Sequence, residues 1–248
     1  MRFDVVTLFP ELFAPFLTSG ITRRAFESGQ VDVQLTNPRD FASGNYRRVD
    51  DRPFGGGPGM VMMAEPLAQS LAHIRSQRTE KAAVILFSPI GKKLDHSMVQ
   101  EFSNGPGAIL LCGRYEGLDQ RFIDAHVELQ ISLGDFVLSG GEIAAMALLD
   151  SVARLQPGVL SDPKSHHQDS FNPALDGLLD CPHYTRPEDW AGAAVPEVLL
   201  SGHHVNIERW RREQSLDLTA RHRPDLLQRA REQGLLSKHD ERFLAGRG

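Results

Sequence analysis

The stretch AILLCGRYEG, residues 108 to 117, decides the fold class. Its first five residues are apolar without alternation, which indicates a strand buried on both faces. Strands of this kind belong to parallel sheets that are covered by helices. The apolar run ends at Gly113, and a second glycine follows at Gly117. The sequence therefore predicts a buried strand that opens into a glycine-bearing loop.

Four other stretches are apolar and of strand length, and helix-forming segments separate them. The strand-like stretches are FDVVTLF (3 to 9), VDVQLT (31 to 36), AAVILFS (82 to 88) and VELQISL (127 to 133). The helix-like segments cover residues 65 to 78, 94 to 102, 118 to 126 and 141 to 155. This alternation predicts an α/β domain over residues 1–160, in which helices flank a mostly parallel sheet.

The composition changes after this domain. Residues 156 to 180 are rich in Pro, Ser, Asp and His, which is typical of a linker or a functional loop. We expect a flexible interdomain linker at 161–180. Helical patterns at 203 to 216, 223 to 234 and 237 to 246 are each bounded by Pro or Gly. They predict a small, mainly helical domain over 181–248.

Composition excludes several classes of protein. The chain has 248 residues and 41% hydrophobic content, and it contains no run of about 18 apolar residues that could span a membrane. The start of the chain lacks the pattern of a signal peptide. Two cysteines, Cys112 and Cys181, form no Cys-x-x-Cys spacing. We therefore expect a cytoplasmic protein without disulfides and without a membrane partner.

Charge is distributed unevenly along the chain. The net charge is −5, yet residues 203 to 248 hold ten Lys and Arg against seven Asp and Glu. A basic segment of this kind could approach a polyanion, although a solvated helical face gives the same pattern.

Glycine recurs where three of the predicted strands end, at 88 to 91, 113 to 117 and 134 to 141. Ligands of open α/β sheets bind outside the carboxyl ends of the strands, so these loops predict one crevice. Glycine lets the backbone approach a flat heterocycle closely. The chain has no phosphate-binding G-x-x-x-x-G-K-[ST], and its densest glycine cluster (52 to 60) follows a charged stretch. Turns and helix ends use glycine too, so a structural role stays open.

A few polar and aromatic residues have both a functional and a structural interpretation. Arg154 suits the last turn of a helix, Asp169 suits a turn, and Glu116 suits either a solvated turn or a cation contact. The histidine pairs at 166–167 and 203–204 lack metal-ligand spacing, so no metal site is expected. Trp190 and Trp210 are expected to be packing residues.

Long motifs in these regions resemble the bacterial tRNA (guanine-N1)-methyltransferases of the knotted SPOUT superfamily, which modify guanine 37, just 3′ of the anticodon. The motifs are DDRPFGGGPGMVM (50 to 62), LFSPIGKKL (86 to 94), LLCGRYEGLDQR (110 to 121), ISLGDFVLSGGEIAAM (131 to 146), SHHQDSF (165 to 171), LLDCPHYTRP (178 to 187) and VPEVLLSGHHVNIERWR (195 to 211). They keep their order over almost the whole chain. The sequence departs from the usual family pattern at Phe87, Phe136 and Ala144.

The resemblance implies that the three loops cross in a trefoil knot and hold S-adenosylmethionine. The residues expected to line that pocket are Ser88, Pro89, Gly113, Tyr115, Glu116, Leu133, Gly134, Asp135, Phe136, Val137, Leu138, Gly140 and Gly141.

The resemblance also implies roles in the reaction. Asp169 would be the general base at guanine N1, and Arg154 would stabilise charge on O6. The partners would be a tRNA with G after the anticodon and a second copy of the chain, with the active site between the two subunits. Arg209, Arg211 and Arg212 would contact tRNA phosphates. Magnesium is associated with activity in the family.

The sequence leaves two alternative functions open and excludes a third. A related knotted methyltransferase could act on a different RNA target, including a ribose hydroxyl, and would not need Asp169 as a base. A non-catalytic RNA-binding module would need only the basic C-terminal segment. A nicotinamide dehydrogenase would need G-x-G-x-x-G after the first strand, and FDVVTLFPELF has none.

Overall fold

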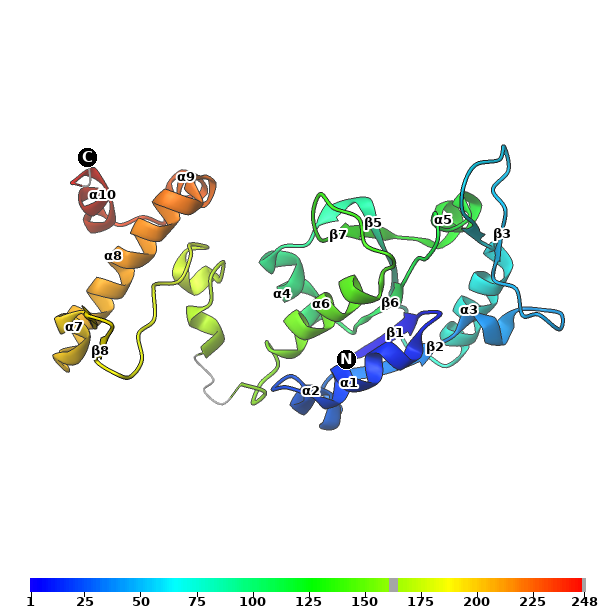
Figure 1. The fold of residues 1–248 in the computed structure, drawn as a ribbon, viewed down its shortest axis with the longest axis horizontal. Helices are drawn as coiled ribbons and strands as arrows, with labels where there is room; N and C mark the ends of the chain where they lie inside the picture. Colours follow the sequence, from blue (N-terminus) through cyan, green and yellow to red (C-terminus); the bar gives the residue numbers. More distant parts are fainter. Residues whose placement is uncertain (161–164, 247–248) are drawn as a thin grey trace. The chain divides into compact units, whose positions relative to one another are not determined.

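The computed structural model describes residues 1–160 and 165–246 and divides the chain into two compact units (Figure 1). The first unit is Met1–Ser161 and the second is Asp162–Gly248. Within the described residues, no helix combines the length and apolar content that a membrane span requires.

A five-stranded sheet forms the centre of the first unit, in the order β2-β1-β6-β5-β7. The strands are β1 (Arg2–Val6), β2 (Asp32–Thr36), β5 (Ala83–Lys93), β6 (Ala108–Leu111) and β7 (Leu129–Ser132). Every neighbouring pair is parallel. All four residues of β6 are buried, as its unbroken apolar run predicts. The prediction of an α/β fold with a mainly parallel sheet is therefore confirmed.

Helices cover both faces of this sheet. Side chains of α1 (Phe13–Thr18), α2 (Arg23–Glu27), α4 (His96–Asn104) and α6 (Glu142–Ala153) belong to one buried apolar cluster, while α3 (Ala64–Ser76) and α5 (Gln120–His126) contribute to a second. Short 3-10 helices, η1 (Pro10–Leu12) and η2 (Pro38–Phe41), complete the unit. Asp95 begins α4 by accepting a 2.9 Å hydrogen bond from the backbone N–H of Met98.

Strand β5 continues beyond the segment that the sequence predicts, and a bulge interrupts its pairing with β7. Phe87 and Lys92 both pair with Ile131 of β7, so the residues between them are pushed out of the ladder. The backbone of Gly91 lies so close to β7 that an added Cβ would stand 2.5 Å from the carbonyl carbon of Gln130. The bulge therefore places residues 88–90 beside the carboxyl end of the sheet.

A small antiparallel hairpin, β3 (Asp50–Asp51) and β4 (Val61–Met62), brings the glycine-rich cluster toward the same end of the sheet. The N–H of Met62 donates to the carbonyl oxygen of Gly117 at 2.8 Å. This hairpin connects the cluster to the loop after β6.

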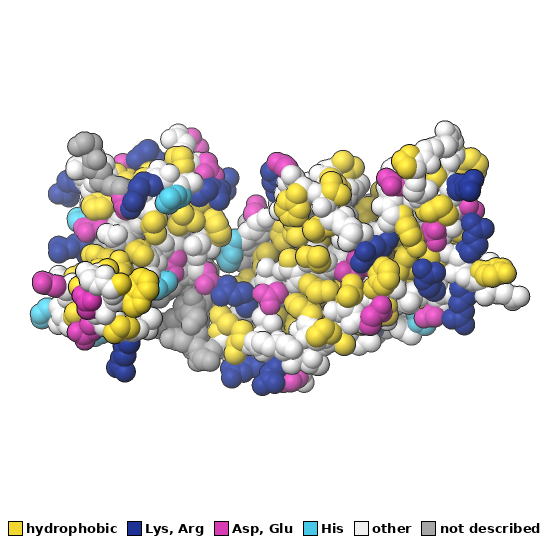
Figure 2. Space-filling model, in the orientation of Figure 1, with side chains coloured by type: hydrophobic (Ala, Val, Ile, Leu, Met, Phe, Trp, Pro, Cys, Tyr) yellow, Lys and Arg dark blue, Asp and Glu magenta, His cyan; other side chains and the backbone are white. Residues whose placement is uncertain are grey.

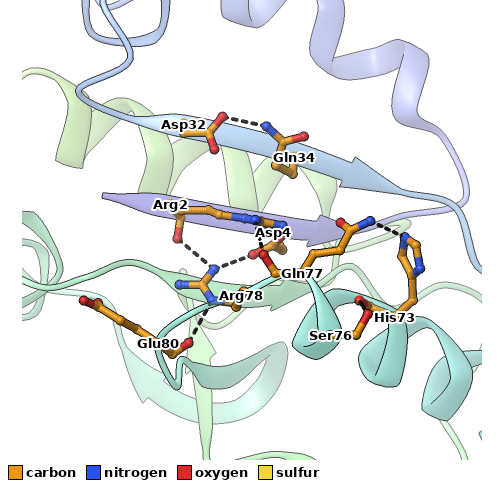
Figure 3. A network of polar contacts seen from close by, with 9 residues as sticks. All are labelled: Arg2, Asp4, Asp32, Gln34, His73, Ser76, Gln77, Arg78 and Glu80. Atoms are coloured by element: carbon orange, nitrogen blue, oxygen red, sulfur yellow. Dashed lines mark hydrogen bonds and ion pairs between the residues drawn. The ribbon is translucent and has the colours of Figure 1, made fainter.

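A buried ionic network holds the opening segment of the sheet (Figure 3). Asp4 in β1 is 1% exposed, and its carboxylate accepts hydrogen bonds from Arg2 and from Arg78, which follows α3. Arg78 also donates to the backbone oxygen of Arg2 at 3.2 Å. A buried carboxylate needs such partners. The network therefore ties the end of α3 to strand β1.

The second unit is mainly helical. It contains η3 (Ser165–Gln168), η4 (Pro173–Leu175), the hairpin β8 (Asp189–Trp190) and β9 (Ala193–Ala194), α7 (Glu197–Leu200), α8 (His204–His222), α9 (Pro224–Glu232) and α10 (Lys238–Ala245). Its core includes Leu178, Leu216, Leu227 and Ala230. Ser237 and Asp240 form a capping box at the start of α10.

The structure describes only part of the segment 161–180, which was expected to be a linker. Residues 161–164 lie outside the described residues. Residues 165–180 contain η3 and η4, joined and followed by irregular segments, and Leu178 is fully buried beside α8 and α9. The backbone N–H of Leu179 donates to the hydroxyl of Thr219 at 3.0 Å. The polar composition that suggested a linker thus belongs to a segment that packs on α8.

Candidate functional site

The bulge inside β5 and the glycine-bearing loops after β6 and β7 enclose one pocket at the carboxyl end of the sheet. Its volume is about 410 Å³, which falls in the range of small-molecule sites. The three loop segments contribute residues 88–90, 113–118 and 133–141, apart from Asp135. The sequence prediction that these three strand ends form one crevice is therefore confirmed.

Twelve of the thirteen residues expected in the pocket line it. They are Ser88, Pro89, Gly113, Tyr115, Glu116, Leu133, Gly134, Phe136, Val137, Leu138, Gly140 and Gly141. Asp135 does not line it. Its side chain is 84% exposed, and its carboxylate forms an ion pair with Lys93 at 2.9 Å.

Gly141 sets the distance between two of the loops. Its N–H donates to the carbonyl oxygen of Gly113 at 3.0 Å. A Cβ at this position would stand 2.7 Å from the Cα of Cys112, which is too close for backbone that cannot move aside. Only glycine allows this approach without displacing the strand end.

A buried ion pair behind the pocket connects the same loops. Glu142, in the first turn of α6, is 1% exposed, and its carboxylate lies 3.0 Å from the Nε of Arg114. The contact is an ion pair without hydrogen-bond alignment. Thr7 donates its hydroxyl proton to the other carboxylate oxygen at 2.9 Å. Arg114 also donates to the backbone oxygen of Ser139 at 3.2 Å and lies 4.4 Å from the centre of the Phe9 ring.

Sequence reasoning missed this cluster. Arg114 joins the loop after β6 to the loop after β7, and Glu142 anchors both to the end of β1. One signal was available, since a glutamate opens a helix whose next seven residues are otherwise apolar. Such a glutamate is either a cap residue or a buried partner of a cation.

The mouth of the pocket is largely apolar and exposed. Tyr115 is 46% exposed, Phe136 is 55% exposed and Val137 is 85% exposed. Tyr115 has a positive φ of 59°, a conformation that costs energy for a residue with a side chain. The next residue, Glu116, packs against Gly59 of the glycine-rich cluster, and its N–H donates to the oxygen of Met60 at 2.9 Å.

Cys112 borders this site but is not suited to nucleophilic chemistry. Burial raises the pKa of its thiol well above the usual range, and the negative charge of Glu142 adds to that effect. A thiol held protonated is a poor nucleophile. Cys112 is therefore a buried structural residue and not a candidate nucleophile.

The two residues expected to carry the reaction lie in different units. Arg154 follows α6 as its C-cap residue, as expected for an arginine at the end of a helix. It lies thirteen positions after Gly141, which corresponds to roughly 20 Å along the helix axis. Asp169 follows η3 in the second unit, and its backbone oxygen accepts the N–H of Asn172 at 3.2 Å.

Arg212 was expected to contact tRNA phosphates, but its guanidinium is already held by two carboxylates of the second unit. Its guanidinium forms ion pairs with Asp176 at 2.7 Å and Asp240 at 3.0 Å. Burial alone would lower the pKa of Arg212, but the two carboxylates outweigh it and raise that pKa. Arg209 and Arg211 on the same helix are exposed.

The other aromatic and metal expectations have mixed outcomes. Trp210 is partly buried, whereas Trp190 is 74% exposed, so the prediction that Trp190 is a packing residue is wrong.

Among the described residues, the only close group of three possible metal ligands is Asp180, Cys181 and His183. The Asp180 carboxylate already bonds to the ring of His183 at 2.9 Å and to the N–H of Cys181 at 2.7 Å.

Comparison with known proteins identifies the family of this chain. The family model described as tRNA (Guanine-1)-methyltransferase TrmD matches residues 1–229. The chain belongs to this family. Three curated relatives of this chain carry the name tRNA (guanine-N(1)-)-methyltransferase. The protein of Albidiferax ferrireducens is 79% identical over 99% of both chains. That of Paracidovorax citrulli is 70% identical over 99% of this chain and 98% of its own length. That of a Polaromonas species is 69% identical over 99% of this chain and 96% of its own length.

Proposed function

We propose that this chain transfers a methyl group from S-adenosylmethionine to N1 of the guanine that follows the anticodon in tRNA, at position 37. Methylation of tRNA guanine at N1 is the activity of the TrmD family to which the chain belongs. The observation that carries the proposal is the pocket formed by three glycine-bearing strand ends.

The residues of the pocket fit an adenosine joined to an amino acid. Backbone atoms of Gly113, Gly140 and Gly141 lie at its wall, where they can hydrogen bond to a heterocycle. Apolar side chains such as Leu86, Pro89 and Leu138 can contact the ring faces. Arg114, which also lines the pocket, is paired with Glu142 and so is not a free phosphate ligand. The bound donor supplies an electrophilic methyl group.

The chemistry of guanine assigns roles to two side chains. N1 of guanine carries a proton that must leave, and negative charge then spreads onto O6. Asp169 accepts that proton as general base, and Arg154 donates N–H groups to O6. An unperturbed aspartate has a pKa of about 3.9, so it needs a dry site and a nearby cation to act efficiently.

The length of α6 supports an active site built from two copies of the chain. Gly141 lies at the pocket, while Arg154 lies about 20 Å farther along the helix. An arginine side chain cannot span that distance. Arg154 and Asp169 of one protomer therefore serve the pocket of its partner in a homodimer. Exposed apolar residues near the pocket mouth, including Val137 and Ile143, provide surface for such an interface.

The finer parts of the family likeness belong to the same proposal. The close approach of Gly141 to Cys112 supports crossing of the loops in a trefoil knot. The first unit would bind the methyl donor and the second would bind tRNA in the cytoplasm. Magnesium would be coordinated by an oxygen ligand such as the carboxylate of Glu116.

The test is transfer of a labelled methyl group to unmodified tRNA with G after the anticodon, beside the same tRNA with A at that position. Transfer to the G-bearing tRNA alone, located at N1, is the expected result. Transfer to a ribose or to another base would support the knotted methyltransferase with a different target. No transfer to either tRNA would refute the proposed reaction.

A further inference from the structure

A second pocket lies wholly within the second unit, between the segment around Tyr184 and helices α7 and α8. Its volume is about 500 Å³. The side chains that define it are Tyr184, Arg186, Leu200, Ile207, Trp210 and Arg211. Figure 2 shows hydrophobic side chains gathered on the surface over α7 and β8. Nothing in the reaction described above uses this pocket.

Aromatic rings form one wall. The rings of Tyr184 and Trp210 lie 6.1 Å apart between centroids, at an interplanar angle of 59°. This tilted contact supports both rings but leaves Tyr184 half exposed, at 50%. A supported aromatic ring that is open to solvent beside a cavity is a stacking platform.

Cations lie at the same pocket. Arg186 and Arg211 line it, and both are exposed. In residues 1–160 and 165–246, no carboxylate forms an ion pair with either of them, whereas Arg212, Arg221, Arg223 and Arg231 are all paired. Glu188 is the one acidic residue in the lining. The pocket therefore offers two guanidinium groups to an anionic ligand.

This combination fits a nucleotide. The aromatic ring can stack on any base, and the arginines can bind the adjoining phosphates. A paired base presents only its edge, so the base must come from a loop or another unpaired position, where it can be splayed out. An acidic peptide would use the arginines but would leave the aromatic wall without a flat partner.

We propose that this pocket stacks one unpaired nucleotide of the substrate tRNA on Tyr184, with Arg186 and Arg211 on its phosphates. The proposal rests on the proposed function for the identity of the RNA. It adds a second recognition point on the tRNA, separate from the guanine that is methylated.

Equilibrium binding of unmodified tRNA to the full chain tests the stacking step. A stacked base is worth about 1–3 kcal/mol, so Tyr184→Leu should raise the Kd for tRNA roughly 5- to 150-fold. Tyr184→Phe keeps the ring and should restore binding. Trp190→Leu removes an aromatic that is more exposed than Tyr184 and lies outside the pocket lining, and this variant should bind like the wild type. Affinity for S-adenosylmethionine should not change in any of these variants.

The salt dependence of the same binding tests the phosphate contacts. Arg211→Gln should lower the slope of log Kd against log salt by about 1. Arg229→Gln makes the same charge change on α9, away from the pocket, and should leave the slope unaltered.

Two results would overturn the proposal. The first is wild-type tRNA affinity for both Tyr184→Leu and Arg211→Gln. The second is loss of affinity that sedimentation traces to dissociation of subunits, which would make the surface a protein interface. The binding readout does not require methyl transfer. Tyr184-dependent binding without methylation would thus refute the proposed reaction and still support this pocket.

Discussion

Substitution of Glu142 by glutamine isolates the charge that holds the pocket loops together. Glutamine keeps the volume of the side chain and can still accept the hydroxyl proton of Thr7, but it cannot pair with Arg114. At 3.0 Å and an effective dielectric constant of about 20, the direct attraction is about 5 kcal/mol. Desolvation of both groups offsets part of it, and the side chain of Arg114 retains 19% exposure, so water can solvate it after the change.

We therefore expect Glu142→Gln to destabilise the first unit by about 2–3 kcal/mol, and to lower its midpoint of thermal unfolding by roughly 5–10 °C. Affinity for S-adenosylmethionine should fall, because Arg114 would no longer hold the loops after β6 and β7 in register. Differential scanning calorimetry and titration of the methyl donor measure the two effects. Thr7→Val is the matched control, since it keeps the charge of Glu142 and removes two hydrogen bonds of the Thr7 hydroxyl, the one donated to Glu142 and the one accepted from the N–H of Phe9, each worth about 1 kcal/mol.

A double-mutant cycle with Arg114→Met assigns the loss to the pair, because Arg114→Met should cost less in Glu142→Gln than in the wild type; the cost that remains comes from the hydrogen bond of Arg114 to Ser139 and its contact with Phe9. Wild-type stability in Glu142→Gln would refute the reasoning about the ion pair. Reduced stability with unchanged affinity for the methyl donor would refute the claim that the pair positions the loops.

Three further predictions concern other parts of the chain. Asp169→Asn should lower the single-turnover rate of methyl transfer about 10²- to 10⁴-fold while leaving methyl-donor binding intact, and a near-normal rate would remove Asp169 from the mechanism. Arg212→Gln should destabilise the second unit by about 2 kcal/mol in urea unfolding, because Asp240 stays buried without its partner, whereas Arg209→Gln should change little. Burial raises the pKa of Cys181 to about 11, so alkylation of the folded chain at pH 8 should be slower than in urea. The stability that this protonated thiol contributes is present below about pH 9 and is lost as the pH rises toward 11, and equal alkylation rates would contradict the raised pKa.

The apolar strands were predictable because burial on both faces removes the polar residues that would otherwise interrupt them. AILLC and AAVILF became adjacent parallel strands, and their glycine-bearing ends met at one pocket. The bulge that extends β5 to Lys93 was not predictable, because it depends on pairing with Ile131, far along the chain. Asp135 was misplaced for a related reason, since one residue decides whether a loop side chain faces the pocket or solvent.

Long-range polar contacts could not be predicted from the sequence either. Glu142 and Thr7 are separated by 135 residues, and no local pattern connects them. The exposure of Trp190, in contrast, has a local cause. It directly precedes the two-residue turn at Ala191 and Gly192, both with positive φ, so it lies at a hairpin tip that nothing in the unit covers. Its apolar character alone suggested burial.

The central claim is that the three glycine-bearing loops hold the methyl donor. Its most direct test is calorimetric titration of S-adenosylmethionine into the wild-type chain, Gly141→Ala and Gly105→Ala. In Gly141→Ala the new Cβ would overlap the backbone of Cys112, whereas in Gly105→Ala it would stand 3.3 Å from the oxygen of Glu101, away from the pocket. We expect binding by the wild type and Gly105→Ala, and affinity roughly 5- to 150-fold weaker in Gly141→Ala, since a backbone shift of this kind costs about 1–3 kcal/mol. Equal affinity in all three chains, or no binding by the wild type, would contradict the account.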